Sequence, residues 1–79
     1  MVYLYILQSF RDKGYYIGIT ANIENRLKKH NKGEVRSTKT RKPFVVIYSE
    51  KFENYKSARI REKEVKSYKG GNAFRGLIK

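Results

Sequence analysis

Arg26 and His30 stand four residues apart in the stretch NRLKKHN. On a helix this spacing brings two side chains to neighbouring turns of the same side. A guanidinium matches the geometry of a phosphate, and an imidazole exchanges a proton near neutral pH. The pair therefore suits the binding and cleavage of a phosphate ester. A solvated basic helix face is the other interpretation, because Lys28, Lys29 and Lys32 are neighbours.

Glu62 is a second candidate for chemistry. Ala58, Glu62 and Val65 follow one another at the spacing of a helical stripe, so a carboxylate falls among residues expected to face the core. A carboxylate in that position needs an ion-pair partner, a metal or a raised pKa. The chain has 19 Lys and Arg residues that could form an ion pair. Mg²⁺ is the alternative partner, since it keeps several waters and can be held by a single protein carboxylate.

Tyrosine is frequent, with seven in 79 residues, and Tyr5 and Tyr16 are among those that lie in apolar stretches typical of strands. Alternation places Tyr5 on one face of the first stretch, and Tyr16 and Gly18 on one face of the second. An antiparallel pairing of the two would bring both phenols to a shared face. A phenol surrounded by Lys and Arg would have a lowered pKa, and its phenolate would take a proton from water. The plainer interpretation is that these tyrosines are amphipathic edges of the core.

Residues 26 to 42 contain eight basic residues and a single acid, Glu34. Within this segment, RSTKTRK alternates charges with hydroxyls, and both kinds of side chain commonly contact phosphate oxygens. A solubilising loop would have a similar composition, but the density of charge favours a track for a polyanion. We expect nucleic-acid contacts from Lys29, Arg36, Lys39, Arg41 and Lys42.

Composition sets wider limits. The length of 79 residues predicts one domain, spanning residues 1–79, and the net charge of +12 predicts a polyanionic partner. Nucleic acid, an anionic membrane surface and an acidic protein all fit that charge. The sequence has no cysteine, which excludes a disulfide framework and a Cys-based zinc site. It shows no apolar run long enough to span a bilayer and no secretory signal, so we expect a cytoplasmic protein.

The elements that must position these residues follow from periodicity and from capping signals. Asn22 is a suitable N-cap, and Gly33 suits the left-handed position after a helix. The apolar start of the third strand predicts a central place in the sheet. At the C-terminal end, Phe74, Leu77 and Ile78 are expected to close the core. We predict strands at 2–8, 15–20 and 44–52 and helices at about 22–32, 54–68 and from 72.

Together these features resemble the GIY-YIG nuclease family. The stretch YLY, ending at Tyr5, is similar to the first motif of the family, and YIG, beginning at Tyr16, is similar to the second. The first motif departs from the usual pattern at Tyr3, where the family has glycine. The resemblance covers nearly the whole chain. The sequence looks most like the small stand-alone bacterial members of the family, and more distantly like the amino-terminal nuclease domain of the excision-repair protein UvrC.

The resemblance also extends to the helical residues. Arg26 and His30 match the Arg and His of the family helix, and Glu62 matches its single metal-binding glutamate. The resemblance implies an α+β fold, with a three-stranded antiparallel β-sheet flanked by α-helices. It also implies a single GIY-YIG domain in which Glu62 holds Mg²⁺ or Mn²⁺ and Arg26 neutralises phosphate charge. Tyr5 or Tyr16 would activate the water, with help from His30. Which phenol is the base stays open.

The implied function is a divalent-metal-dependent endonuclease that hydrolyses phosphodiester bonds in DNA, in repair or recombination. The partner is nucleic acid, with DNA favoured over RNA, and neither a membrane nor a small-molecule cofactor is expected. The alternative is a non-catalytic module on the same fold that binds DNA or structured RNA. A ribosome-associated basic protein is a third interpretation. Glu62 separates an enzyme from these two, because a pure binder needs the basic segment but not this carboxylate.

Overall fold

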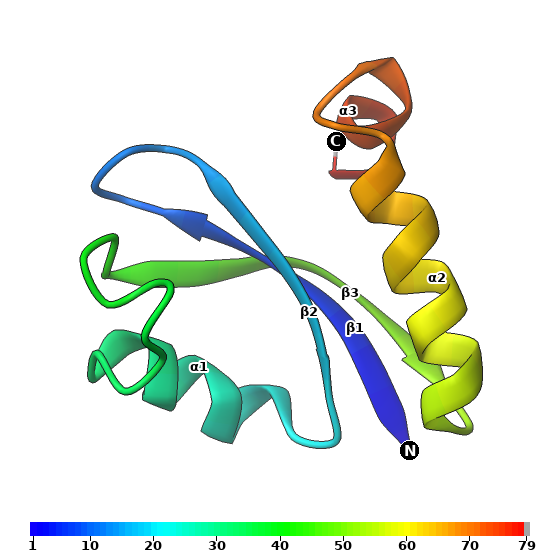
Figure 1. Cartoon of the computed structure of the whole chain (residues 1–79), viewed down its shortest axis with the longest axis horizontal. Coiled ribbons are helices and arrows are strands. Elements are labelled where there is room, and N and C mark those ends of the chain that lie inside the picture. The colour runs from blue at the N-terminus through cyan, green and yellow to red at the C-terminus, as the bar shows by residue number, and fades with distance from the viewer. Residues whose placement is uncertain (79) are drawn as a thin grey trace.

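A computed structural model of the chain describes residues 1–78 and contains three strands and three helices. The strands form one antiparallel sheet with helices packed around it (Figure 1), which confirms the α+β class. The predicted order of strands and helices is also confirmed. In chain order the elements are β1 (Val2–Ser9), β2 (Tyr15–Thr20), α1 (Ile23–Asn31), β3 (Phe44–Phe52), α2 (Tyr55–Ser67) and α3 (Asn72–Ile78).

The sheet has the order β2-β1-β3, so β1 is the central strand. The prediction that β3 is central is therefore wrong. β1 carries no charged residue and is mostly buried, whereas the second half of β3 contains Glu50 and Lys51, which an edge strand tolerates. The apolar start of β3 has a different cause. Both faces of the sheet are covered, so apolar side chains of β3 pack into the cluster on each face. Asn31 forms hydrogen bonds with the backbone at the start of β3. Its side chain accepts from the Phe44 N–H at 2.7 Å and donates to the Phe44 carbonyl at 3.1 Å.

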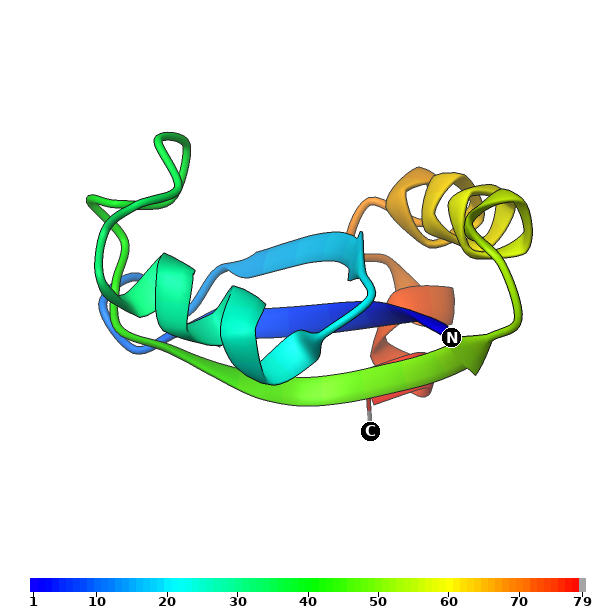
Figure 2. The same cartoon turned by 90° about the horizontal axis from the view of Figure 1, so that it is seen from below.

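Two apolar clusters lie on opposite faces of the sheet, as the alternation along β1 and β2 predicts. Leu4 and Ile6 pack with side chains from α2 and α3, including the three residues predicted to close the core. Tyr5 and Leu7 lie on the other face, against Phe44 and side chains of α1. Figures 1 and 2 show α1 near one end of the sheet and α2 with α3 near the other. The face that carries Tyr5 is therefore the face that α1 covers.

The helix ends follow the capping signals. The side chain of Asn22 accepts from the N–H of Asn25 at 3.0 Å, and Asn54 caps α2 in the same way through Ser57 at 2.9 Å. Gly33 has φ +77°, the left-handed conformation expected after α1. Within residues 1–78 no helix has the length and apolar character that crossing a membrane requires.

Candidate active site

The register between β1 and β2 builds the centre of the site. Tyr5 pairs with Gly18, and Leu7 pairs with Tyr16, so the two phenols lie on one face with ring centroids 6.3 Å apart. The ring of Tyr5 lies directly over Gly18. A Cβ at residue 18 would stand 2.7 Å from the Tyr5 hydroxyl oxygen, closer than side-chain atoms approach. Glycine is required here because the phenol occupies the space that a side chain would fill.

Helix α1 brings its Arg and His to the hydroxyl of Tyr5. The Tyr5 Oη lies 3.3 Å from His30 Nε2, and Arg26 Nε donates to the same oxygen at 3.4 Å. The His30 ring also meets the ring of Tyr16 edge to face at 4.8 Å between centroids. Tyr5 and His30 are buried, whereas Tyr16 and Arg26 are partly exposed. The structure thus brings together four of the residues that the sequence identified. The buried pair, Tyr5 and His30, lies beneath the partly exposed side chains.

Burial decides the protonation of this cluster. It raises the pKa of Tyr5, and the hydrogen bond from Arg26 opposes this rise only in part, so the expectation of a lowered phenol pKa is wrong for Tyr5. Burial, followed by the positive charge of Arg26, lowers the pKa of His30 to about 4. The hydrogen bond to Tyr5 raises the pKa of Arg26. At neutral pH the site therefore holds a neutral phenol, a neutral imidazole and a guanidinium.

Glu62 enters from α2, which an ion pair fixes against the sheet. The guanidinium of Arg61 donates to both carboxylate oxygens of Glu50 on β3, at 2.9 and 3.0 Å. The next residue, Glu62, has a side chain 19% exposed and pairs with Lys66 at 3.1 Å, which confirms the ion pair considered for this carboxylate. Its negative charge also contributes to the raised pKa of Tyr5. Glu62 is therefore close enough to interact electrostatically with the cluster.

A divalent cation would find one carboxylate at this site. Residues 1–78 contain no group of three or more His, Cys, Asp or Glu side chains that could hold a metal together. Glu62 offers the hard oxygen donor that Mg²⁺ prefers, and its partial exposure leaves room for the waters that this ion retains. The side chain thus fits a water-rich Mg²⁺ or Mn²⁺ ion, which would compete with Lys66 for the carboxylate.

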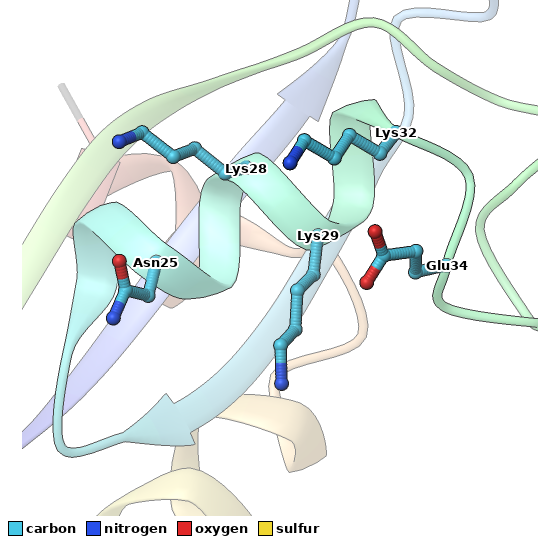
Figure 3. Close-up of a pocket in the computed structure, with 5 residues that line it drawn as sticks. All are labelled: Asn25, Lys28, Lys29, Lys32 and Glu34. Atoms are coloured by element: carbon cyan, nitrogen blue, oxygen red, sulfur yellow. The ribbon is translucent and has the colours of Figure 1, made fainter.

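The exposed face of α1 carries a basic pocket that the sequence prediction covered only in part. Its volume is about 250 Å³. Lys29 was expected to bind nucleic acid, and the structure adds Lys28 from the same helix and Lys32 directly after it (Figure 3). Asn25 and Glu34 complete the lining. Lys28 also pairs with Glu24 at 3.7 Å, and the net positive charge of the lining suits a phosphate backbone.

The loop between α1 and β3 is less uniform than predicted. Arg36, Lys39 and Lys42 are exposed, as a polyanion track requires. Arg41 is instead engaged within the protein, because its Nε lies 2.8 Å from Asp12 and its guanidinium lies over the ring of Phe44. Arg41 is therefore less available for phosphate than its neighbours in the segment.

Thr38 is a residue of the site that sequence reasoning missed. It was grouped with the hydroxyls expected to contact phosphate, yet it is 1% exposed, and its Oγ1 lies 2.7 Å from His30 Nδ1. No periodic signal links a loop residue to a helix residue eight positions earlier. The only hint was an unusual number of hydroxyls in RSTKTRK.

Comparison with known proteins shows the family of this chain. The family model described as the GIY-YIG catalytic domain matches residues 1–73. The chain belongs to the GIY-YIG family. It is 40% identical over 67 residues to a UPF0213 protein of Staphylococcus haemolyticus, a match that spans 84% of this chain and 80% of the relative. A UPF0213 protein of Clostridium perfringens is 42% identical over 67 residues, covering 84% of this chain and 71% of that protein.

A solved structure also resembles this GIY-YIG domain. The solution NMR structure of a UPF0213 protein from Bacillus halodurans has a TM-score of 0.50 and 32% sequence identity, and the match covers 92% of this chain and 90% of that one. Membership of the GIY-YIG family gives the chain a nuclease-type fold. The stretches YLY and YIG, in which the sequence resembles the two motifs of the family, lie on β1 and β2, where Tyr5 pairs with Gly18.

Proposed function

We propose that this GIY-YIG domain, residues 1–79, is a divalent-metal-dependent endonuclease that hydrolyses phosphodiester bonds in DNA. The observation that carries the proposal is the contact of Tyr5, His30 and Arg26 around one phenol oxygen. It combines a proton acceptor with a phosphate-binding cation, the two groups that phosphodiester hydrolysis needs from side chains. The basic pocket on α1 and the exposed cations of the following loop support a polyanionic substrate.

Proton transfer would run through Tyr5 to His30. Since the phenol is neutral at rest, it acts as a base only by giving its own proton to His30 Nε2 while its oxygen takes a proton from water. The water oxygen then bonds to phosphorus, and the bond from phosphorus to the leaving oxygen breaks. Neutral His30 suits this role because its low pKa leaves the ring nitrogen free to accept. The phenol is neutral again after this step, and the proton that leaves the water has passed to His30.

Arg26 and Glu62 would act on the phosphate side. Arg26 is partly exposed and bonds Tyr5 over a long 3.4 Å, so a phosphate can draw the guanidinium outward and open the buried phenol oxygen to water. Such contacts often tighten only when substrate is bound. Glu62 would hold Mg²⁺ or Mn²⁺, which supplies Lewis-acid stabilisation of the charge on the phosphate and leaving oxygen. Tyr16 lies beside His30 at the partly exposed surface and would line the substrate.

The test is a cleavage and binding panel of labelled duplex, nicked, branched and single-stranded DNA, with matched RNAs, in Mg²⁺ or Mn²⁺. We expect the wild type to cleave at least one DNA form. Glu62→Gln should abolish that cleavage while nucleic-acid binding stays equal or becomes tighter, because the carboxylate repels phosphate when no metal lies between them. Glu53→Gln, at an exposed carboxylate just before α2, is the matched control and should cleave normally.

The alternative is a non-catalytic nucleic-acid-binding module, and the Glu62–Lys66 ion pair is the observation that favours it. In that case the wild type would bind the panel without cleaving it. Glu62→Gln would then lower the melting temperature, because removing the carboxylate leaves Lys66 without its partner, and added Mg²⁺ would not change the melting of either protein. Cleavage that survives Glu62→Gln with an unchanged response to Mg²⁺ would refute the metal-binding role.

A further inference from the structure

His30 and Thr38 form a buried polar pair that the proposed chemistry does not explain. His30 is 0% exposed and Thr38 is 1% exposed, and their Nδ1 and Oγ1 atoms are 2.7 Å apart. The loop holds Thr38 in place through backbone hydrogen bonds from the Thr38 N–H to Val35 and from the Arg41 N–H to Thr38. A buried imidazole that touches a hydroxyl on each ring nitrogen can exist in two neutral forms, with the proton on Nδ1 or on Nε2.

The Tyr5 end of the chain of hydrogen bonds selects one form. Within residues 1–78 the Tyr5 hydroxyl has two hydrogen-bond partners, Arg26 Nε and His30 Nε2. Arginine only donates, so the hydroxyl hydrogen of Tyr5 has to point at His30 Nε2, which must then carry a lone pair. With the proton on Nε2, the buried Tyr5 hydrogen would have no acceptor, and an unsatisfied buried donor is costly.

The Thr38 end accommodates the same form. Thr38 Oγ1 also lies 3.4 Å from the carbonyl oxygen of Val35, which can only accept. With Nδ1 protonated, as the Tyr5 end requires, the hydroxyl accepts from His30 Nδ1–H at 2.7 Å and donates to Val35. Both ends agree on a directed chain from Arg26 through Tyr5 to His30, and from His30 through Thr38 to Val35.

We propose that Thr38 is a positioning residue that holds His30 in the Nδ1–H form, so that Nε2 always faces Tyr5 as a proton acceptor. Free histidine prefers the opposite form, with the proton on Nε2, and this would turn His30 into a donor toward Tyr5. A hydroxyl at residue 38 offers the acceptor that reverses this preference. The importance of Thr38 for cleavage rests on the proposed function, whereas the form of the imidazole is a property of the folded chain alone.

The tautomer can be measured without any activity. The chain has one histidine, so a long-range ¹H–¹⁵N correlation spectrum of uniformly ¹⁵N-labelled protein near neutral pH contains a single imidazole. We expect a protonated Nδ1 and an unprotonated Nε2 in the wild type. Thr38→Val, which keeps the shape and removes the acceptor, should shift the imidazole toward Nε2–H, and Thr38→Ser should restore the wild-type spectrum.

Thr40→Val is the matched control, since Thr40 is an exposed threonine of the same loop, and it should leave the spectrum unchanged. A wild-type imidazole protonated on Nε2, or an unchanged imidazole in folded Thr38→Val, would overturn the proposal. Should Thr38→Val fail to fold, the wild type and Thr38→Ser still decide, because both must show Nδ1–H.

Cleavage provides the second measurement. Thr38→Val should lower kcat by about 10-fold to 100-fold, the range typical when an outer partner of a functional histidine is removed, with little change in KM. Thr38→Ser should recover most of the rate. A normal kcat in a variant whose tautomer has changed would refute the positioning role. If the wild type cleaves nothing, the proposed function fails, while the spectrum still decides the role of Thr38 in setting the form of His30.

Discussion

The lowered pKa of His30 makes the stability of the fold depend on pH. In the unfolded chain the imidazole has its ordinary pKa of 6.5, whereas in the folded protein it stays neutral down to about 4. The unfolded state therefore binds more protons between these values. Stability is fully present above about pH 6.5 and is lost as the pH falls toward about 4. The cause is physical, because protonation would place a second positive charge beside Arg26 in a buried site.

The size of the effect follows from the two pKa values. The whole interval corresponds to about 3 kcal/mol of unfolding free energy, of which about 2 kcal/mol is lost between about pH 7.5 and about pH 5. The acidic groups with shifted pKa values do not contribute to the pH dependence between about pH 7.5 and about pH 5. Asp12, Glu50 and Glu64 all have lowered pKa values, below ordinary values of 3.8 or 4.5, so their contributions are lost at lower pH.

Urea unfolding at several pH values would test this prediction. Constant salt of about 0.2 M limits the general repulsion expected from a net charge of +12. The wild type should lose about 2 kcal/mol across the window, whereas His30→Gln should show nearly flat stability because it lacks the titrating group. Equal pH dependence in the two proteins would refute the reasoning. Should the variant fail to fold, an NMR titration of the single histidine decides, and a pKa near 6.5 would contradict burial as its controlling influence.

Two further predictions concern packing and the basic surface. Gly18→Ala should lower the unfolding free energy by about 1–3 kcal/mol in urea titrations, because the new Cβ would stand 2.7 Å from the Tyr5 hydroxyl oxygen. Gly76→Ala, where nothing lies within 4 Å, is its control, and an equally small loss in both would contradict the close contact. Replacing Lys28, Lys29 and Lys32 together by Ala should weaken DNA binding and reduce the slope of log affinity against log salt by about 0.9 per lost phosphate contact. The same charge change at Lys51, Lys69 and Arg75, all exposed, should leave the slope nearly unchanged, and equal slopes in the two triple variants would exclude the α1 pocket as a specific contact.

Local features were predictable from the sequence because they depend on near neighbours in the chain. The predicted bounds of β2 and β3 are confirmed, and Asn22 caps α1 as expected. Alternation along β1 and β2 correctly placed Tyr5 and Tyr16 on a shared face, and helical spacing put Arg26 and His30 on the same side of α1. Each of these follows from a period of two or of 3.6 residues, which one strand or one helix expresses by itself.

Long-range relations required the tertiary structure. The apolar run of β3 could not reveal an edge position, because burial of its two faces says nothing about which strands pair along its sides. The charge count near Tyr5 predicted a lowered phenol pKa, whereas burial of the ring raises it. Ion pairs also depend on distant chain segments, as in the case of Arg41, whose partner Asp12 lies in another loop.

The relation between His30 and Thr38 shows the same limit most clearly. The sequence identified the imidazole by its spacing from Arg26, but the state of that imidazole depends on which atoms meet its two nitrogens. One of these atoms comes from a strand and the other from a loop. Their direction is set by the requirement that buried donors find acceptors, a condition that applies to the folded chain as a whole. Residue types and spacing identify which side chains can do chemistry, whereas the folded structure sets their protonation and their partners.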